Sequence, residues 1–476
     1  MNLPVDFTNR MKEYLQDEYE AFLASYEKPE VKGIRFNTLA PGEYLGAICN
    51  NIISLNEETK KIPWCDEGYY YINGAGNTSD GTEFRPGKHP YHEAGAYYIQ
   101  EPSAMAPVTY LEVEPGDRVL DLCASPGGKS TQIAAKLQGE GILIANEIMP
   151  DRAKILSENI ERMGVRNALV ISEDPRNISD KFAGFFDKVL VDAPCSGEGM
   201  FRRGDTAVNE WSLENVAACA SRQEWILDEA AKMLADGGTL CYSTCTFSRE
   251  ENEEQIVSFL KRHEEFELSE MTVYEGMSRG YAADGYDSVG IRLFPHKLEG
   301  EGHYVCRLHK KGVSEVKIPP VYGYEPDLSK KDRADLKDMF GLFEDIFTEK
   351  FLEYVGERRI TRFKDQIYLL PEGCPSLKGL RVLRPGLHLG TVLKNRFEPG
   401  HALAMSVSVD EVKKRCILTS EEQEIYKYFN GETFNVTDEG TGWHVIFVDG
   451  ISAGWGKLTN LVMKNHFPKG IRKNLR

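Results

Sequence analysis

The chain has 476 residues, of which 41% are hydrophobic, and a formal net charge of −17 at pH 7. This length indicates about three domains, each able to bury a core of its own. No run approaches the ~18 apolar residues of a membrane span, and the charged start MNLPVDFTNRMKEYL does not fit a signal peptide, so we expect a cytoplasmic protein that contacts no membrane. The acidic balance argues against general binding to polyanions, so any contact with nucleic acid must come from a local basic patch.

The first two thirds of the chain predict two α/β units. Residues 1–72 combine a helix over 6–26 with a strand over 32–39, which indicates a small N-terminal α/β domain. From 73 to 310, strand-like runs alternate with helical patterns. This alternation is typical of a doubly wound, Rossmann-like parallel sheet, which binds ligands at the carboxyl ends of its strands. We expect strands at 117–125, 141–148, 167–174, 186–194 and 239–246, and helices at 129–137, 152–164 and 223–238.

The C-terminal third begins with a linker. Residues 313–337 are rich in proline, tyrosine and charge, so we expect a linker and intermediate domain over 311–385, followed by a mixed α/β or β-rich RNA-binding domain over 386–476. Residues 377–397 carry five Lys or Arg and no acid, and those from Ile451 carry six and no acid, interleaved with Trp455, His466 and Phe467. Two such stretches favour a module that contacts phosphates, and a solvated surface with a basic tail is the alternative.

The motif VLDLCASPGGKST, residues 119–131, predicts a strand, a tight Pro-Gly-Gly turn and a helix. Gly127 and Gly128 let the backbone approach a ligand, and the N-terminus of the helix offers unpaired N–H groups. The motif has neither the G-x-G-x-x-G spacing of dinucleotide-binding proteins nor the G-x-x-x-x-G-K-[ST] spacing of phosphate loops. It therefore argues against a dehydrogenase or an NTPase.

Acids stand at the ends of the next three strands: Glu147, Asp174 and Asp192. The first can accept hydrogen bonds from ribose hydroxyls, and the second can meet an adenine amino group. Each alone is better explained as a helix cap or a solvated turn, but together, at one edge of a parallel sheet, the three favour a pocket. An acidic rim suits a ligand that has adenosine, no phosphates and a cationic sulfonium. The sequence therefore predicts S-adenosylmethionine as the cofactor.

Two cysteines, Cys195 and Cys245, follow predicted strands at the same edge as the cofactor turn. Cys241 and Cys245 share a strand and lie roughly 13 Å apart at about 3.3 Å per residue, too far for a disulfide or a shared zinc ion. The ten cysteines show no paired C-x-x-C spacing and the ten histidines no metal-binding spacing. We expect free thiols, no metal, and a structural role for His303. Spacing alone leaves open whether Cys195 and Cys245 pack or react.

The segments DLCASPGGKS, DAPCSG and YSTCTFSREENE, in this order, resemble the signature motifs of the Nop/Sun family of RNA cytosine-5 methyltransferases. YYIQEPSAM and RLFPHKLEGEGHY are similar to further segments of that family, so the resemblance covers about residues 90–310. GWGKLTNLVMKNHFPKGIR extends it toward the bacterial RsmF (YebU) branch, whose members modify 16S ribosomal RNA of the small subunit. The C-terminal region is then expected to be PUA-like.

The resemblance implies a role for each residue of the site. Cys245 would be the nucleophile that attacks carbon 6 of cytosine, because a soft thiolate adds and leaves again readily, and Cys195 would assist product release. Asp192 would hydrogen-bond the cytosine edge near N3, and Lys129 would support the base and lower nearby thiol pKa values. Cys241 would only pack in the core. The cofactor site would consist of Cys123, Ala124, Ser125, Pro126, Gly127, Gly128, Lys129, Glu147, Asp174 and Asp192.

The implied activity is S-adenosylmethionine-dependent methylation of carbon 5 of cytosine in 16S ribosomal RNA, with ribosomal RNA or the small ribosomal subunit as the partner. A tRNA cytosine-5 methyltransferase with the same mechanism is the chief alternative. A ribosome-assembly RNA-binding factor with a silent methyltransferase domain is another, and intact Cys195, Cys245 and Asp192 argue against it. The sequence decides neither the modified cytosine nor the oligomeric state.

Overall fold

The computed structural model describes residues 3–54, 60–71, 85–313, 323–394, 396–437, 440–473 and 475. The predicted boundary at residues 72 and 73, and residues 314–322 of the predicted linker, lie outside the described residues. Further along the predicted linker, α12 (Lys330–Asp335) begins after Ser329, whose side chain accepts a hydrogen bond from the Asp332 N–H. The division of the chain at residues 72, 310 and 385 stays a prediction.

The N-terminal part holds two short helices followed by a three-stranded sheet. The helix predicted over 6–26 is interrupted, because Gln16 has a φ of +48°, which an α-helix does not accommodate. The result is α1 (Val5–Leu15), a 3-10 turn and α2 (Tyr19–Ser25), which pack through Phe7 and Phe22 on Phe201 and Phe247. The antiparallel sheet has the order β2-β1-β3, with β1 (Lys32–Phe36), β2 (Gly68–Tyr71) and β3 (Tyr97–Gln100); α3 (Gly42–Ser54) and α4 (Pro90–Glu93) accompany it.

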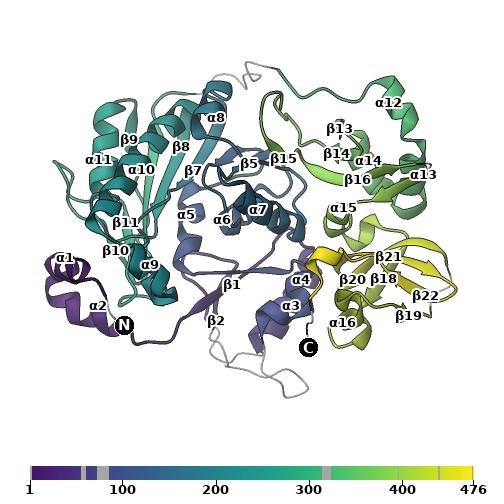
Figure 1. The fold of residues 1–476 in the computed structure, drawn as a ribbon, viewed down its shortest axis with the longest axis horizontal. Helices are drawn as coiled ribbons and strands as arrows, with labels where there is room; N and C mark the ends of the chain where they lie inside the picture. Colours follow the sequence, from purple (N-terminus) through teal and green to yellow (C-terminus); the bar gives the residue numbers. More distant parts are fainter. Residues whose placement is uncertain are drawn as a thin grey trace.

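A ten-stranded mixed sheet lies at the centre of the molecule (Figure 1). Its parallel strands have the spatial order β6-β5-β4-β7-β8, with β4 (Arg118–Asp121), β5 (Ile142–Asn146), β6 (Ala168–Ile171), β7 (Phe186–Asp192) and β8 (Leu234–Thr244). Antiparallel strands extend it: β9 (Phe266–Leu268), β10 (Met277–Arg279), β11 (Ile291–Leu293) and β12 (His303–Lys310) beyond β8, and β15 (Val382–Arg384) beside β6. The strand order reverses between β4 and β7, and sheets of this kind bind ligands at the carboxyl ends next to the reversal. The predicted doubly wound fold is confirmed.

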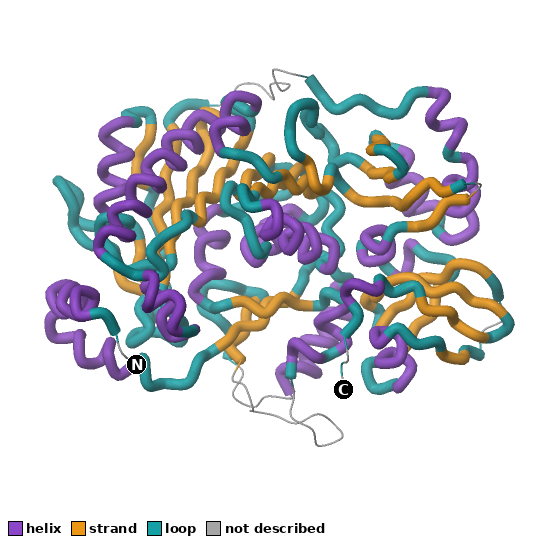
Figure 2. Tube along the Cα trace, in the orientation of Figure 1, coloured by secondary structure: helices purple, strands orange, loops and turns teal. Residues whose placement is uncertain are grey.

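Helices cover both faces of this sheet (Figure 2). One face packs on α5 (Ala106–Leu111), α6 (Gly128–Leu137) and α7 (Pro150–Arg162), and the other on α8 (Pro175–Lys181), α10 (Leu213–Met233) and α11 (Glu253–Arg262). Val119 and Leu120 of β4 belong to opposite cores, because neighbouring strand residues point to opposite faces. Two-sided burial explains why these strands read as continuous apolar runs.

The C-terminal part contains two further sheets and is β-rich, as predicted. The first is antiparallel and contains β13 (Ile360–Phe363), β14 (Gln366–Leu369), β16 (Leu387–Leu393) and β17 (Arg396–Pro399), with α13 (Lys337–Ile346) and α14 (Glu349–Gly356) nearby. The second contains β18 (Arg415–Leu418), β20 (Gly442–Val448), β21 (Ile451–Thr459), β22 (Val462–Asn465) and β19 (Phe434–Asn435), with α15 (His401–Met405) and α16 (Gln423–Asn430). Among the described residues, no helix is both long and apolar enough to cross a membrane.

The basic stretch 377–397 is used partly inside the protein. Arg381 lies 3.7 Å from Glu173, and the buried Arg384 pairs with Glu161 of α7. Arg384 thus joins β15 to α7, and Arg381, directly before β15, lies near the end of β6. These two cations are therefore occupied by acids of this chain, which the sequence pattern could not reveal.

Trp455 and Phe467 of the last stretch are core residues, whereas His466 is half-buried. Trp455 and Phe467 are both 2% exposed, so they do not contribute to a surface that contacts RNA. Among the exposed cations of this stretch, Lys457 and Lys464 lie side by side on β21 and β22. Lys457 is also paired across the strands with Trp443, and its Nζ lies 5.5 Å from the centre of that ring.

Candidate active site

The Pro-Gly-Gly turn connects β4 to α6 and is held from two sides. Gly127 has a φ of +110°, a conformation that glycine adopts without strain. Asn159 of α7 donates a hydrogen bond to the Pro126 carbonyl at 2.9 Å, and Arg35 of β1 donates one to the Gly128 carbonyl at 2.9 Å. The N-terminal sheet and α7 thus fix the turn at the carboxyl end of β4.

Two of the predicted cofactor acids have different surroundings. Glu147, directly after β5, is 4% exposed, and its carboxylate accepts a hydrogen bond from the Met149 N–H at 2.9 Å and lies 3.6 Å from Arg152. Most of its lone pairs stay available to a ligand. Asp174 caps α8 instead, because it accepts a hydrogen bond from the Arg176 N–H at 2.9 Å.

Asp121, the last residue of β4, is a buried acid that the sequence analysis did not single out. Its Oδ2 accepts a hydrogen bond from Ser130 Oγ at 2.6 Å, whereas its Oδ1 has no partner among the described residues. Burial raises the pKa of this carboxyl to about 7. A buried acceptor without a partner, next to the turn, fits a hydrogen-bond donor or a cationic group of a bound ligand.

Asp192, the last residue of β7, is the centre of a charged cluster. Its Oδ2 accepts a hydrogen bond from Lys129 Nζ at 2.7 Å, and its Oδ1 accepts one from Ser243 Oγ at 2.7 Å. His303 Nε2 lies 3.6 Å from the same Oδ1. Burial opposes the charge of Asp192, but Lys129 and His303 hold its pKa well below the usual value. Burial likewise lowers the pKa of Lys129, but Asp192 more than compensates and the net shift is upward, so both groups are ionised at neutral pH.

The thiols that follow β7 and β8 meet at the same edge of the sheet. Cys195 Sγ lies 3.3 Å from Cys245 Sγ and accepts a hydrogen bond from the Cys245 N–H at 3.4 Å. The hydrogen bond to Cys245, together with burial, raises the pKa of the Cys195 thiol well above its usual value. Cys195 therefore keeps its proton and can donate it toward Cys245. Cys241 is fully buried, with its thiol donating to the Pro107 carbonyl at 3.3 Å, as expected of a core residue.

Buried polar contacts join the two loops that carry these thiols. Glu251 accepts hydrogen bonds from Ser196 N at 3.0 Å, Ser196 Oγ at 2.5 Å and Gln223 Nε2 at 2.8 Å. The Gly199 N–H donates to the Cys245 carbonyl at 2.8 Å, and a Cβ at Gly199 would lie 2.9 Å from that oxygen. The spacing of the thiols is therefore set by contacts on both sides of the pair.

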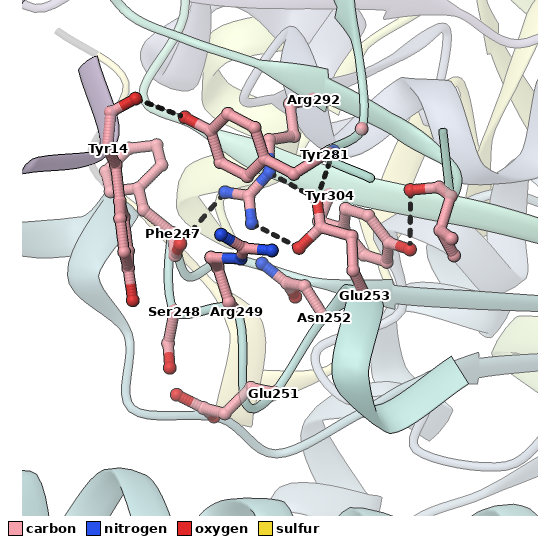
Figure 3. Close-up of polar contacts among 12 residues, drawn as sticks. Tyr14, Phe247, Ser248, Arg249, Glu251, Asn252, Glu253, Tyr281, Arg292 and Tyr304 are labelled. Atoms are coloured by element: carbon pink, nitrogen blue, oxygen red, sulfur yellow. Dashed lines mark hydrogen bonds and ion pairs between the residues drawn. The ribbon is translucent and has the colours of Figure 1, made fainter. Parts of the chain in front are cut away.

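A buried ion pair supports the second loop (Figure 3). Arg292 of β11 pairs with Glu253 at the start of α11, and their side chains are 1% and 0% exposed. Arg292 also donates a hydrogen bond to the Phe247 carbonyl at 2.9 Å, and the Tyr281 ring lies 4.4 Å from its guanidinium carbon. Phe247 follows Cys245 by two residues, so the ion pair fixes the backbone just beyond that thiol.

The structure brings Lys129, Asp192, Cys195 and Cys245 together at the carboxyl ends of β4, β7 and β8. Their neighbours all lie in segments that resemble the family, with Asp121 in DLCASPGGKS, Ser243 and Glu251 in YSTCTFSREENE, and His303 in RLFPHKLEGEGHY, but only the fold shows which of them contact the four residues. The residues that the sequence analysis missed or assigned elsewhere are Asp121, Ser243, Glu251 and His303. In the described ranges, no cluster of three or more His, Cys, Asp or Glu could hold a metal ion.

Comparison with known proteins assigns the chain to a family. Four family models match in succession: "N-terminal domain of 16S rRNA methyltransferase RsmF" (3–102), "16S rRNA methyltransferase RsmB/F" (108–309), "RsmF rRNA methyltransferase first C-terminal domain" (346–407) and "Methyltransferase RsmF PUA domain" (417–473). The ribosomal RNA small subunit methyltransferase F of Vibrio campbellii is 33% identical over 471 residues, which cover 95% of this chain and 93% of the relative. The chain belongs to the RsmF family.

Solved structures share the fold of this RsmF-family chain. A methyltransferase homolog from Pyrococcus horikoshii matches with a TM-score of 0.53 and 25% identity, over 64% of this chain and 94% of that chain. NSun6 from the same organism matches with a TM-score of 0.53 and 24% identity, over 65% of this chain and 99% of that chain. Membership of this family makes the chain an RNA methyltransferase with S-adenosylmethionine as its cofactor.

Proposed function

We propose that this RsmF-family chain methylates carbon 5 of cytosine in 16S ribosomal RNA through a covalent adduct between Cys245 and carbon 6 of the base. The observation that carries the proposal is the pair of thiols 3.3 Å apart beside the Lys129–Asp192 ion pair. On this proposal the chain works in the cytoplasm, on ribosomal RNA or the small subunit. The family membership and the PUA match support this choice of substrate.

The need for two thiols follows from the chemistry of the base. Carbon 5 becomes nucleophilic only after a nucleophile adds to carbon 6, and a thiolate adds and leaves readily. The Cys245–C6 bond forms, carbon 5 takes the methyl group of S-adenosylmethionine, carbon 5 then loses its proton, and the C6–S bond breaks to restore the ring. The family resemblance assigns the attack to Cys245, and the raised pKa of Cys195, which keeps that thiol protonated, agrees with this assignment. Cys195 assists the release step.

Lys129 and Asp192 recognise different groups of the base, one as a hydrogen-bond donor and the other as an acceptor. An ionised carboxylate only accepts hydrogen bonds, so Asp192 accepts from the exocyclic amino group of cytosine, next to N3. An ammonium only donates, so Lys129 donates to the ring edge on which negative charge develops as the thiolate adds. This division refines the role expected of Asp192, since a carboxylate without a proton cannot itself donate to N3.

The cofactor site consists of the turn 123–129 with Glu147 and Asp192. Glu147 has lone pairs available for two ribose hydroxyls, and the unpartnered Oδ1 of Asp121 adds a buried acceptor beside the turn. The acidic rim suits the cationic sulfonium. Asp174 contributes to the adenine end only if its carboxylate can serve the α8 cap and the ligand together.

The two thiols fail differently when they are removed, and this difference tests the proposal. Cys245→Ala should transfer no methyl group and form no adduct, whereas Cys195→Ala should attack and methylate but stall before release. Cys195→Ala should therefore accumulate a protein–RNA species that survives denaturing gel electrophoresis, and the double variant should lose it. Cys219→Ala, at a buried thiol of α10, is the matched control.

Small ribosomal subunits, naked 16S RNA and tRNA serve as substrates in parallel, and the methylated nucleoside is identified by mass spectrometry. An adduct with Cys245→Ala and none with Cys195→Ala would reverse the two roles. Full activity of both variants would make the thiols packing residues and end the proposal. Preferred methylation of tRNA would change the substrate while leaving the chemistry in place.

A further inference from the structure

His303 is a buried group of the site that the proposed reaction leaves unused. It is the first residue of β12, and its side chain is 4% exposed. The register of β12 on β8 pairs Tyr304 with Thr244, so one step further His303 stands beside the position of Cys245. A histidine expected to be structural thus lies at the sheet edge where the thiols and Asp192 meet.

The imidazole of His303 is aimed into this site. Its Nε2 is buried and forms no hydrogen bond with any described residue, and it lies 3.6 Å from Asp192 Oδ1. Buried polar atoms in native proteins are normally paired, so an unpaired one calls for a function. Hydrogen bonds in an active site without substrate are often long and shorten when the substrate binds. The distance between Nε2 and Oδ1 fits a bond of this kind.

A hydrogen bond from His303 would limit the ways in which the Asp192 carboxylate can accept further hydrogen bonds. A carboxylate has about four lone-pair sites. Lys129 occupies one on Oδ2, and Ser243 occupies one on Oδ1. With His303 on the second site of Oδ1, a single site on Oδ2 remains. A single remaining site defines one direction in which Asp192 can accept a hydrogen bond.

We propose that His303 is a positioning residue for Asp192. When the target base is bound, His303 donates its Nε2 hydrogen to Asp192 Oδ1, and the last lone pair of Asp192 then points at the exocyclic amino group of cytosine. The inference rests on the proposed function for the identity of that base. His303 itself touches neither the base nor the cofactor. Its contribution is to the methyl-transfer step, not to cofactor binding or folding.

The test compares His303→Leu, His303→Gln and His303→Asn in the full-length protein. Leucine removes the donor, the glutamine amide can reach the place of Nε2 and donate there, and the asparagine amide is too short. His309→Leu, on the same strand, is the control. The readouts are the single-turnover rate of methyl transfer from labelled S-adenosylmethionine to small-subunit RNA, the cofactor dissociation constant and the thermal unfolding midpoint.

We expect His303→Leu and His303→Asn to slow methyl transfer roughly 10- to 100-fold, the usual effect of losing a hydrogen bond to a charged group. His303→Gln should recover most of the rate, with cofactor affinity and unfolding midpoint unchanged in the folded variants. If His303→Leu does not fold, the difference between glutamine and asparagine carries the test. Equal rates for glutamine and asparagine, or a leucine variant as fast as the wild type, would overturn the proposal. Nucleoside analysis separates the two proposals: a product other than 5-methylcytidine refutes the proposed function, while the order of the variant rates still decides the role of His303.

Discussion

Replacing Glu251 by glutamine should change how the stability of the protein depends on pH. Glu251 is fully buried between the two thiol loops, and this burial raises its pKa from 4.5 to about 7. A carboxyl with a raised pKa binds its proton more tightly in the folded chain, so it lowers the free energy of unfolding as pH rises from the unfolded value through the folded one. The difference between 4.5 and 7 corresponds to about 3 kcal/mol, most of which falls between pH 5 and pH 8.

Glutamine reproduces the protonated carboxyl at this site. Its amide group can donate to Ser196 Oγ where Glu251 Oε1 stands, and its carbonyl can accept from Ser196 N and Gln223 Nε2 where Oε2 stands. The free energy of unfolding of Glu251→Gln should therefore match that of the wild type at pH 5 and exceed it by about 2–3 kcal/mol at pH 8. Asp121, whose pKa is also raised to about 7, keeps its own contribution in both proteins.

The assay is urea unfolding followed by tryptophan fluorescence at half-unit steps from pH 5 to pH 8. Glu250→Gln is the control, because the hydrogen bonds and charge around Glu250 outweigh its burial and lower its pKa. The free energy of unfolding of Glu250→Gln should fall between pH 5 and pH 8 as steeply as that of the wild type. A Glu251→Gln variant whose unfolding free energy falls as steeply as that of the wild type would refute the reasoning, since Glu251 would then be ionised at no cost in the folded protein.

Two further predictions concern ligands. Glu147→Gln should weaken S-adenosylmethionine binding by roughly 10- to 100-fold, because hydrogen bonds from ribose hydroxyls to a charged acceptor are lost; calorimetry measures this, and unchanged affinity would remove Glu147 from the cofactor site. Replacing both Lys457 and Lys464 by glutamine should raise the RNA dissociation constant and reduce the slope of its logarithm against log salt by about 1.4, since each contact to a single-stranded phosphate contributes about 0.7. An identical slope would show that neither lysine contacts phosphate.

The sequence predicted what local patterns encode. Alternating strands and helices defined the central sheet, and because parallel strands share one carboxyl edge, the ends of β4, β7 and β8 could be expected to lie together. This reasoning placed Lys129, Asp192, Cys195 and Cys245 in one region. It could not place His303, since the position of β12 against β8 depends on antiparallel register, and a shift of one residue would turn the side chain to the other face.

Long-range pairing also explains why part of the basic stretch 377–397 is not available to RNA. An acid-free stretch resembles an RNA-binding surface whether its cations face solvent or meet acids from elsewhere in the chain. Arg381 and Arg384 meet Glu173 and Glu161, which precede them by more than 200 residues. Only the folded chain shows which cations are already occupied.

This pairing bears on how so acidic a protein can hold RNA. Surface cations that pair with acids of their own chain release no counterions when RNA binds. In a chain with a net charge of −17, few cations are therefore left to contact phosphates. Among the described residues, Lys457 and Lys464 form no ion pair. Lys457 lies next to Trp443, whose ring can stack on a base. Binding through few phosphates would be weak alone and would favour RNA that also places a base beside Cys195 and Cys245. The choice of RNA would then depend on simultaneous contact with the C-terminal sheet, at β21 and β22, and with the carboxyl edge of the central sheet.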